Sequence, residues 1–162
     1  MGIRYYTGKT SDCGCFIKWD QRHWDAFVDI SADQGGQWQS VAVPLEHIDA
    51  GDMSRDGFWR GLGQNALWEN DLARVFQWDG VIQPTAWESR QGHIHLLMRS
   101  TRGRICRSDS IDNGRTWSPA DATALPNNNS GIDLAHLGGG RLALVYNPIA
   151  DHAPAAIVLS CY

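Results

Sequence analysis

Closely spaced histidines and glycines are the first candidates for chemistry in this chain. His93 and His95 lie two apart in an alternating segment, so we expect them on one face of a strand. Such a pair can hold a metal only with a third ligand, and a pair of surface histidines is the alternative. Residues 61–66 match G-x-G-x-x-A, but residues 58–60 before them are not the apolar strand that nucleotide binding requires. We therefore expect no metal and no cofactor.

Two segments of the chain repeat one turn pattern. Residues 31–38 and 110–117 both read S-x-D-x-G-x-x-W. An Asp carboxylate can accept hydrogen bonds from backbone N–H groups further along a turn, and Gly adopts the positive φ that other residues resist. The Trp buries a large ring against a neighbouring sheet. The repeat predicts two tight hairpins whose structural residues are Ser31, Asp33, Gly35, Trp38, Ser110, Asp112, Gly114, Thr116 and Trp117.

Short strands with frequent turns surround these motifs. Residues 93–99 alternate with period two, which is typical of a half-buried strand, and turn residues recur about every ten positions. The two motifs lie 79 residues apart, whereas one propeller blade takes about 40–50 residues. The pattern predicts a partial blade at 1–45, an insertion or loop at 46–80 with a short helix at 65–76 as one alternative, a full blade at 81–125 and a partial blade at 126–162.

Composition excludes several functional classes. The net charge is −4 with no basic block, which gives nucleic-acid binding no electrostatic support. No apolar run approaches the ~18 residues of a membrane span. Residues 1–10 lack the apolar core of a signal peptide, so we expect a cytoplasmic protein with its four cysteines reduced.

Several further segments match one known family. They are residues 82–85 (IQPT) with 87–89 (WES), 97–101 (LMRST), the second turn motif, 127–133 (NNNSGID) and 144–147 (LVYN). In combination they resemble the sialidase-like BNR or Asp-box β-propellers. The resemblance implies an all-β fold, a partial propeller of four-stranded antiparallel blades, of which this chain would hold about two and a half. It also implies that the Asp boxes are structural and lie away from the ligand face.

The resemblance also indicates a binding site. Family members hold a sugar carboxylate with arginines, and Arg99 occupies the matching L-x-x-R-S context; a surface Arg that ends a strand is the alternative. Gln83 stands where the family has a Glu that activates a Tyr nucleophile, and an amide cannot act as a base. Asn128 and Asn129 are candidates to line the sugar site. Tyr146 is a further candidate, with a packed aromatic as the alternative.

These observations predict a sialidase-like protein of the exo-glycosidase type whose substrates are acidic glycans. The protein is either an active enzyme or an inactive relative. A uronate-specific lyase is an alternative, in which Arg99 neutralises the carboxylate and His93 or His95 moves a proton. A non-catalytic glycan-binding module is the second alternative. The expected partners are an acidic glycan and, through open blade edges, further copies of the chain.

Overall fold

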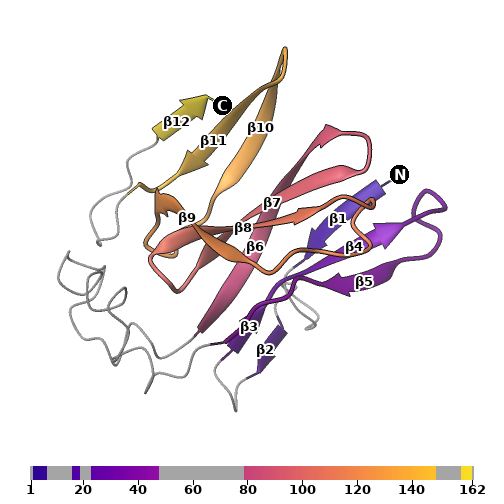
Figure 1. The fold of residues 1–162 in the computed structure, drawn as a ribbon, viewed down its shortest axis with the longest axis horizontal. Helices are drawn as coiled ribbons and strands as arrows, with labels where there is room; N and C mark the ends of the chain where they lie inside the picture. The colour runs from indigo at the N-terminus through magenta and orange to yellow at the C-terminus, as the bar shows by residue number, and fades with distance from the viewer. Residues whose placement is uncertain (1, 7–15, 19–22, 48–78, 149–157, 162) are drawn as a thin grey trace.

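The computed structural model describes residues 2–6, 16–18, 23–47, 79–148 and 158–161 (Figure 1). All regular structure in these residues is β-strand, and no helix in them could cross a bilayer. The all-β prediction is therefore confirmed. The strands are β1 (Gly2–Tyr6), β2 (Phe16–Lys18), β3 (His23–Asp25), β4 (Phe27–Ser31), β5 (Gln39–Ala42), β6 (Asp79–Arg90), β7 (His93–Ser100), β8 (Arg104–Ser110), β9 (Asp121–Pro126), β10 (Asp133–Gly138), β11 (Arg141–Tyr146) and β12 (Val158–Cys161).

An antiparallel meander of β6, β7, β8 and β9 forms the central sheet. The alternation seen in the sequence explains how β7 is buried. Ile94, Leu96 and Met98 are at most 2% exposed and pack on the side of β4 and β5. Leu97 points to the opposite face and packs with residues of β11. Both faces of the central sheet are therefore covered.

Two smaller antiparallel sheets flank the centre. The first sheet has the order β1-β4-β5, and the third sheet has the order β10-β11-β12. Figure 1 shows the three sheets fanning out side by side, as expected for part of a propeller. The core between the first and central sheets contains Ala26, Val28, Ile30, Val43, Val81, Ile94, Leu96, Met98, Cys106, Trp117 and Ala120. The core between the central and third sheets contains Leu97, Ile105, Leu144 and Tyr146.

A short parallel pair joins β3 to the start of β6. His23 pairs with Asp79 and Trp24 with Gly80, so the central sheet extends to six strands in the order β2-β3-β6-β7-β8-β9. A glycine is needed for this approach: a Cβ at Gly80 would lie 2.2 Å from the Trp24 carbonyl oxygen. The sequence did not indicate this connection.

The two Asp boxes adopt matching hydrogen-bonded turns. In the second box the Asp112 carboxylate accepts bonds from the Ser110 hydroxyl at 2.8 Å and from the Thr116 backbone N–H at 2.9 Å. In the first box Asp33 accepts the equivalent bonds from Ser31 and from the Gln37 backbone N–H, both at 2.8 Å. The turns also require Gly35 and Gly114, whose φ angles are 98° and 82°. Their places in the two hairpins match the prediction from the repeat.

The two Asp boxes differ in their hydrogen-bond donors and in the exposure of their tryptophans. The Thr116 hydroxyl donates a further bond to Asp112 at 2.6 Å, and with the other donors it lowers the pKa of Asp112 to about 2. Gln37 supplies only a backbone N–H to Asp33, whose pKa is also lowered. Trp117 is 7% exposed between the first and central sheets, whereas Trp38 is 36% exposed and is not part of that core.

Some expectations fall outside the described residues. The short helix considered at 65–76 is among them, together with residues 48–78 of the predicted insertion at 46–80, as are Cys13 and Cys15. Cys106 is a buried free thiol, and the state of the other cysteines stays a prediction. β6 begins at Asp79, two residues before the expected start of the second blade, and the division of the chain into blades stays a prediction.

Candidate functional site

The end of β7 carries Arg99 opposite a distortion in β6. Ile82 pairs with Arg99, and the next pair is Thr85 with Leu97, so Gln83 and one further residue form a β-bulge. Gln83 is exposed and has a φ of 51°, a conformation that residues other than glycine seldom adopt. Bulges and strained backbone occur often beside binding sites, where they redirect a side chain. The bulge therefore brings two of the predicted site residues to one place.

The Asn-rich loop after β9 closes over Arg99. One terminal nitrogen of the Arg99 guanidinium donates to the backbone carbonyl of Asn129 at 2.7 Å. Asn129 has a φ of 62°, and its buried side-chain oxygen has no hydrogen-bond partner. The Asn128 side-chain oxygen accepts a bond from the Ser130 hydroxyl at 2.5 Å. The structure thus places Asn129 against Arg99, from a segment 30 residues later in the chain.

The loop is braced on both sides. Asp133 accepts a long bond of 3.4 Å from the Thr85 hydroxyl, which links β10 to β6. The fully buried Asn127 amide donates to the carbonyl of Asn147 at 3.5 Å. These contacts connect the central and third sheets directly below the loop. The orientation of Asn128 and Asn129 is therefore fixed by two sheets rather than by the loop alone.

Tyr146 is part of the core. Its side chain is 8% exposed and packs with Leu97, Ile105 and Leu144 between the central and third sheets. These surroundings fit the interpretation of Tyr146 as a packed aromatic. Among the candidate site residues, Arg99 and Asn129 are in contact, and Gln83 lies in the bulge next to the Ile82–Arg99 pair.

A charged network that the sequence did not reveal lies at the same end of the central sheet. Asp79 is 4% exposed and accepts two bonds of 2.8 Å from Arg102, in the turn after β7. His47 lies between Asp79, at 3.0 Å, and Asp25, at 2.7 Å, and its ring stacks on His23 at 3.7 Å between centroids. Sequence separations of 22 to 32 residues hide these contacts from motif analysis.

The network holds His47 in its charged form. Burial alone would lower the pKa of His47, but its hydrogen bonds to Asp25 and Asp79 outweigh that effect and raise the pKa to about 9. Arg102 is committed to Asp79 and to the backbone carbonyl of Glu46. We interpret this cluster as a clamp between the first and central sheets, which holds the turn next to Arg99.

Arg99 carries the charge that anion binding requires, and one of its terminal nitrogens is already bonded to the Asn129 carbonyl. A guanidinium matches a carboxylate in charge and in the geometry of its donors. Gln83 offers an amide beside it and no base. In the residues that the structure describes, no group of three His, Cys, Asp or Glu side chains is arranged to hold a metal ion.

The two histidines of β7 do not belong to this site. His95 and Arg99 share a face of β7 but lie four residues apart, which is about 13 Å along a strand. His95 bonds instead to Ser89 and Asp109. A proton transfer by His95 to a sugar held at Arg99 is therefore not favoured by the geometry.

The Asp boxes lie at the other end of the sheets. In Figure 1 the turn after β4 and the turn after β8 are on the right, whereas the β7–β8 turn and the loop into β10 are on the left. The boxes thus lie at the opposite end of the sheets from Arg99, and their distance from a ligand stays a prediction.

Comparisons with known proteins relate the chain to larger proteins. A structure of a protein of unknown function from Dyadobacter fermentans is similar with a TM-score of 0.54 at 13% identity, over 89% of this chain and 30% of that one. A NanB sialidase variant from Streptococcus pneumoniae has a TM-score of 0.46 at 16% identity, over 85% and 20%. A structure described as NanB plus Optactamide has a TM-score of 0.48 at 18% identity, over 79% and 16%. The chain thus spans less than a third of each of these proteins. None of the curated proteins matches the sequence.

A family model gives the assignment. The model described as a BNR repeat-like domain matches residues 7–160, nearly the whole chain. The match agrees with the two Asp boxes and with the all-β fold on which they lie. The chain belongs to the BNR repeat-like domain family.

Proposed function

We propose that this chain is a sialidase-like carbohydrate-active protein that recognises acidic glycans, of the sialic-acid type, through Arg99. The observation that carries the proposal is the meeting of three features at one point: the Arg99 guanidinium, the strained bulge at Gln83, and the Asn129 backbone that Arg99 contacts at 2.7 Å. Membership of the BNR repeat-like domain family supports it.

Recognition is the step that these residues supply. A sugar carboxylate would take charge-assisted bonds from Arg99, and the amide of Gln83 would serve a hydroxyl or carbonyl group of the sugar. Exo-glycosidic hydrolysis is the reaction class that the family implies. Gln83 cannot activate a nucleophile, so a base for that reaction would have to come from another part of the site.

The direct test is binding of a sialyl oligosaccharide measured by calorimetry. A hydrogen bond to a charged group is worth about 1.5–3 kcal/mol, so Arg99→Ala should weaken binding about 10- to 100-fold. Arg104→Ala is a matched control, because Arg104 also donates to a backbone carbonyl at 2.7 Å, that of Ala124. Equal loss in both variants, or binding unchanged by Arg99→Ala, would refute the assignment of the site.

Two activity assays separate the reaction classes. Release of the fluorophore from a sialoside would indicate a hydrolase, and an unsaturated uronate product would indicate a lyase. Binding without either product would indicate a glycan-binding module. Unfolding data on Arg99→Ala distinguish loss of the site from loss of the fold.

A further inference from the structure

A second cluster of reactive side chains lies on the central sheet, away from Arg99. The Ser89 hydroxyl is 2.7 Å from Nε2 of His95, and Nδ1 of His95 is 2.5 Å from a carboxylate oxygen of Asp109. Ser89 is exposed, and the His95 side chain is 16% exposed. Serine, histidine and aspartate in this order form the arrangement that activates a hydroxyl nucleophile.

The strand register explains why these residues meet. His95 pairs with Trp87 on β6 and with Asp109 on β8, so the three strands present their side chains on one face. Ser89 lies within a second register shift of β6, between Glu88 and Arg90. That bulge turns Ser89 toward the ring of His95.

The protonation pattern follows from the contacts. When Nδ1–H donates to Asp109, Nε2 of His95 is left to accept the proton of Ser89. Burial alone would raise the pKa of Asp109, but its bonds to His95 and Arg107 lower it, which keeps the carboxylate ionised. In this tautomer Arg107, whose terminal nitrogen is 3.1 Å from Nδ1, finds no acceptor there, because both groups are donors. Arg107 bonds instead to Asp109, to which its Nε donates at 2.9 Å.

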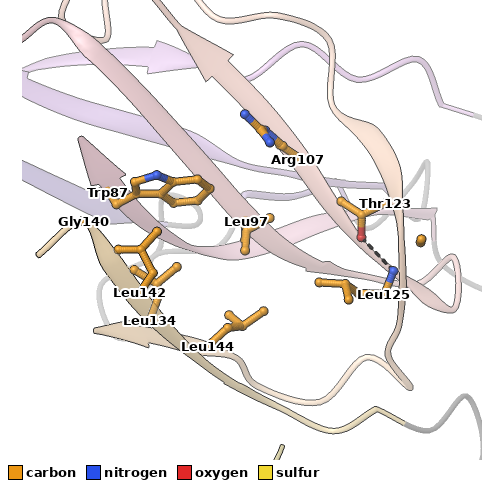
Figure 2. Close-up of a pocket in the computed structure, with 10 residues that line it drawn as sticks. Trp87, Leu97, Arg107, Thr123, Leu125, Leu134, Gly140, Leu142 and Leu144 are labelled. Carbon is orange, nitrogen blue, oxygen red and sulfur yellow. Dashed lines mark hydrogen bonds between the residues drawn. The ribbon is translucent and has the colours of Figure 1, made fainter. Parts of the chain in front are cut away.

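An apolar pocket adjoins this cluster. It has a volume of about 380 Å³ between the central and third sheets, and leucines of both sheets line it, among them Leu97, Leu142 and Leu144. Figure 2 shows Trp87 and Arg107 on its wall. Trp87 stacks on His95 at 4.7 Å between centroids, and Arg107 bonds to Asp109, so two residues belong to the pocket and contact the cluster.

We propose that Ser89, His95 and Asp109 form a second active site, which hydrolyses esters whose acyl group is apolar and fills the adjoining pocket. The Ser89 oxygen attacks the ester carbonyl carbon and its proton passes to Nε2 of His95. The bond from that carbon to the alcohol oxygen then breaks, and the alcohol leaves with the proton from Nε2. Water attacks the acyl-serine in the same way, which releases the acid and returns the proton to Ser89.

The pocket determines the substrate class. Five leucines and the Trp87 ring make up most of its lining, with Thr123, Ala124 and Gly140, and Arg107 is the charged residue among the described residues that line it. An aliphatic or aromatic acyl group is therefore favoured over a charged one. The proposal is independent of glycan recognition, because Ser89 and Gln83 lie six residues apart on β6, about 20 Å.

The test uses the full chain with two probes. An alkyl fluorophosphonate should label Ser89, as located by peptide mass spectrometry, and p-nitrophenyl butyrate should be hydrolysed. Ser89→Ala should abolish the label and reduce hydrolysis at least about 100-fold, and His95→Gln should reduce both. Leu142→Trp, which fills the pocket, should raise the KM for p-nitrophenyl butyrate. The same variant should still react almost normally with a methyl fluorophosphonate, whose alkyl group is small.

The matched control is Ser40→Ala. Ser40 is also exposed and bonds to a carboxylate, that of Asp29, but none of the histidines that the structure describes is bonded to it. It should stay unlabelled, and its removal should leave hydrolysis unchanged. A label on another residue, no label at all, or equal hydrolysis in Ser89→Ala would overturn the proposal. Mapping the label on the unaltered chain gives the answer even when a variant does not fold. The ester carries neither sugar nor carboxylate, so its outcome is separate from that of the glycan test.

Discussion

The paired tryptophans of the two Asp boxes allow a quantitative test of how the sheets pack. Both residues occupy the last position of the same motif, but Trp117 is 7% exposed and Trp38 is 36% exposed. Trp117 fills the core between the first and central sheets, where Ile30 and Ile94 lie beside its box at Gly114. Replacing each with alanine removes the same atoms from two different environments.

The expected magnitudes follow from burial. A buried aromatic removes about 150–250 Å² from water, and loss of a large core side chain costs about 3–5 kcal/mol, including the cavity that remains. We expect about 4 kcal/mol for Trp117→Ala. Trp38→Ala should cost about 1–2 kcal/mol, because part of its surface is already exposed and solvent can enter the space it leaves.

A third variant separates the ring from its N–H group. The indole nitrogen of Trp117 is buried with no hydrogen-bond partner, whereas that of Trp38 donates to the Gly35 carbonyl at 3.0 Å. Trp117→Phe removes an unsatisfied donor and should therefore cost much less than Trp117→Ala. The assay is urea unfolding followed by far-ultraviolet circular dichroism. Equal costs for the two alanine variants, or a larger cost for Trp38, would refute the packing described here.

Four other predictions follow from named contacts. Asp112 has a pKa of about 2 in the folded chain, so its contribution to stability should be present above pH ~4 and lost as the pH falls toward 2. In Asp112→Asn the free energy of unfolding should therefore change less with pH between these values in an acid-unfolding experiment. His47 has its pKa raised to about 9, so its contribution should be present below pH ~6.5 and lost as the pH rises through 9; His47→Gln should remove that alkaline loss, and an unchanged melting profile would contradict the network. Gln83→Glu places a negative charge in the bulge next to the Ile82–Arg99 pair and should weaken binding of acidic glycans but not of neutral ones, as measured by calorimetry. Leu137 and Val145 are 51% and 39% exposed on the third sheet, and we propose that such surface drives self-association; Leu137→Glu should lower the mass found by light scattering at high concentration, and an unchanged mass would argue against it.

The sequence allowed the fold class and the turns to be predicted because both depend on local chemistry. Each Asp box is closed by bonds within eight residues, so its residue types alone indicate the turn. The alternation in β7 likewise records which side chains face each core. The parallel pairing of Trp24 with Gly80 left no such mark, because one glycine in a strand has many explanations.

The candidate sites could be predicted only in part. Arg99 was found through a family resemblance, but its contact with Asn129 joins a strand to a loop residue 30 positions later in the chain. The ion pair of Asp79 with Arg102 and the cluster of Ser89, His95 and Asp109 depend on strand register and bulges, which sequence spacing does not specify. His95 was noted as a possible ligand beside His93, yet its partners come from the neighbouring strands.

The most direct test of glycan recognition observes the guanidinium itself. Titration of the isotope-labelled chain with a methyl sialoside should shift the side-chain N–H signals of Arg99 and of the Asn128 and Asn129 amides, while those of Arg104 stay in place. The same sugar with its carboxylate converted to a methyl ester should produce much smaller shifts. Shifts that persist with the ester, or that occur at Arg104 and not at Arg99, would contradict the site proposed for this protein.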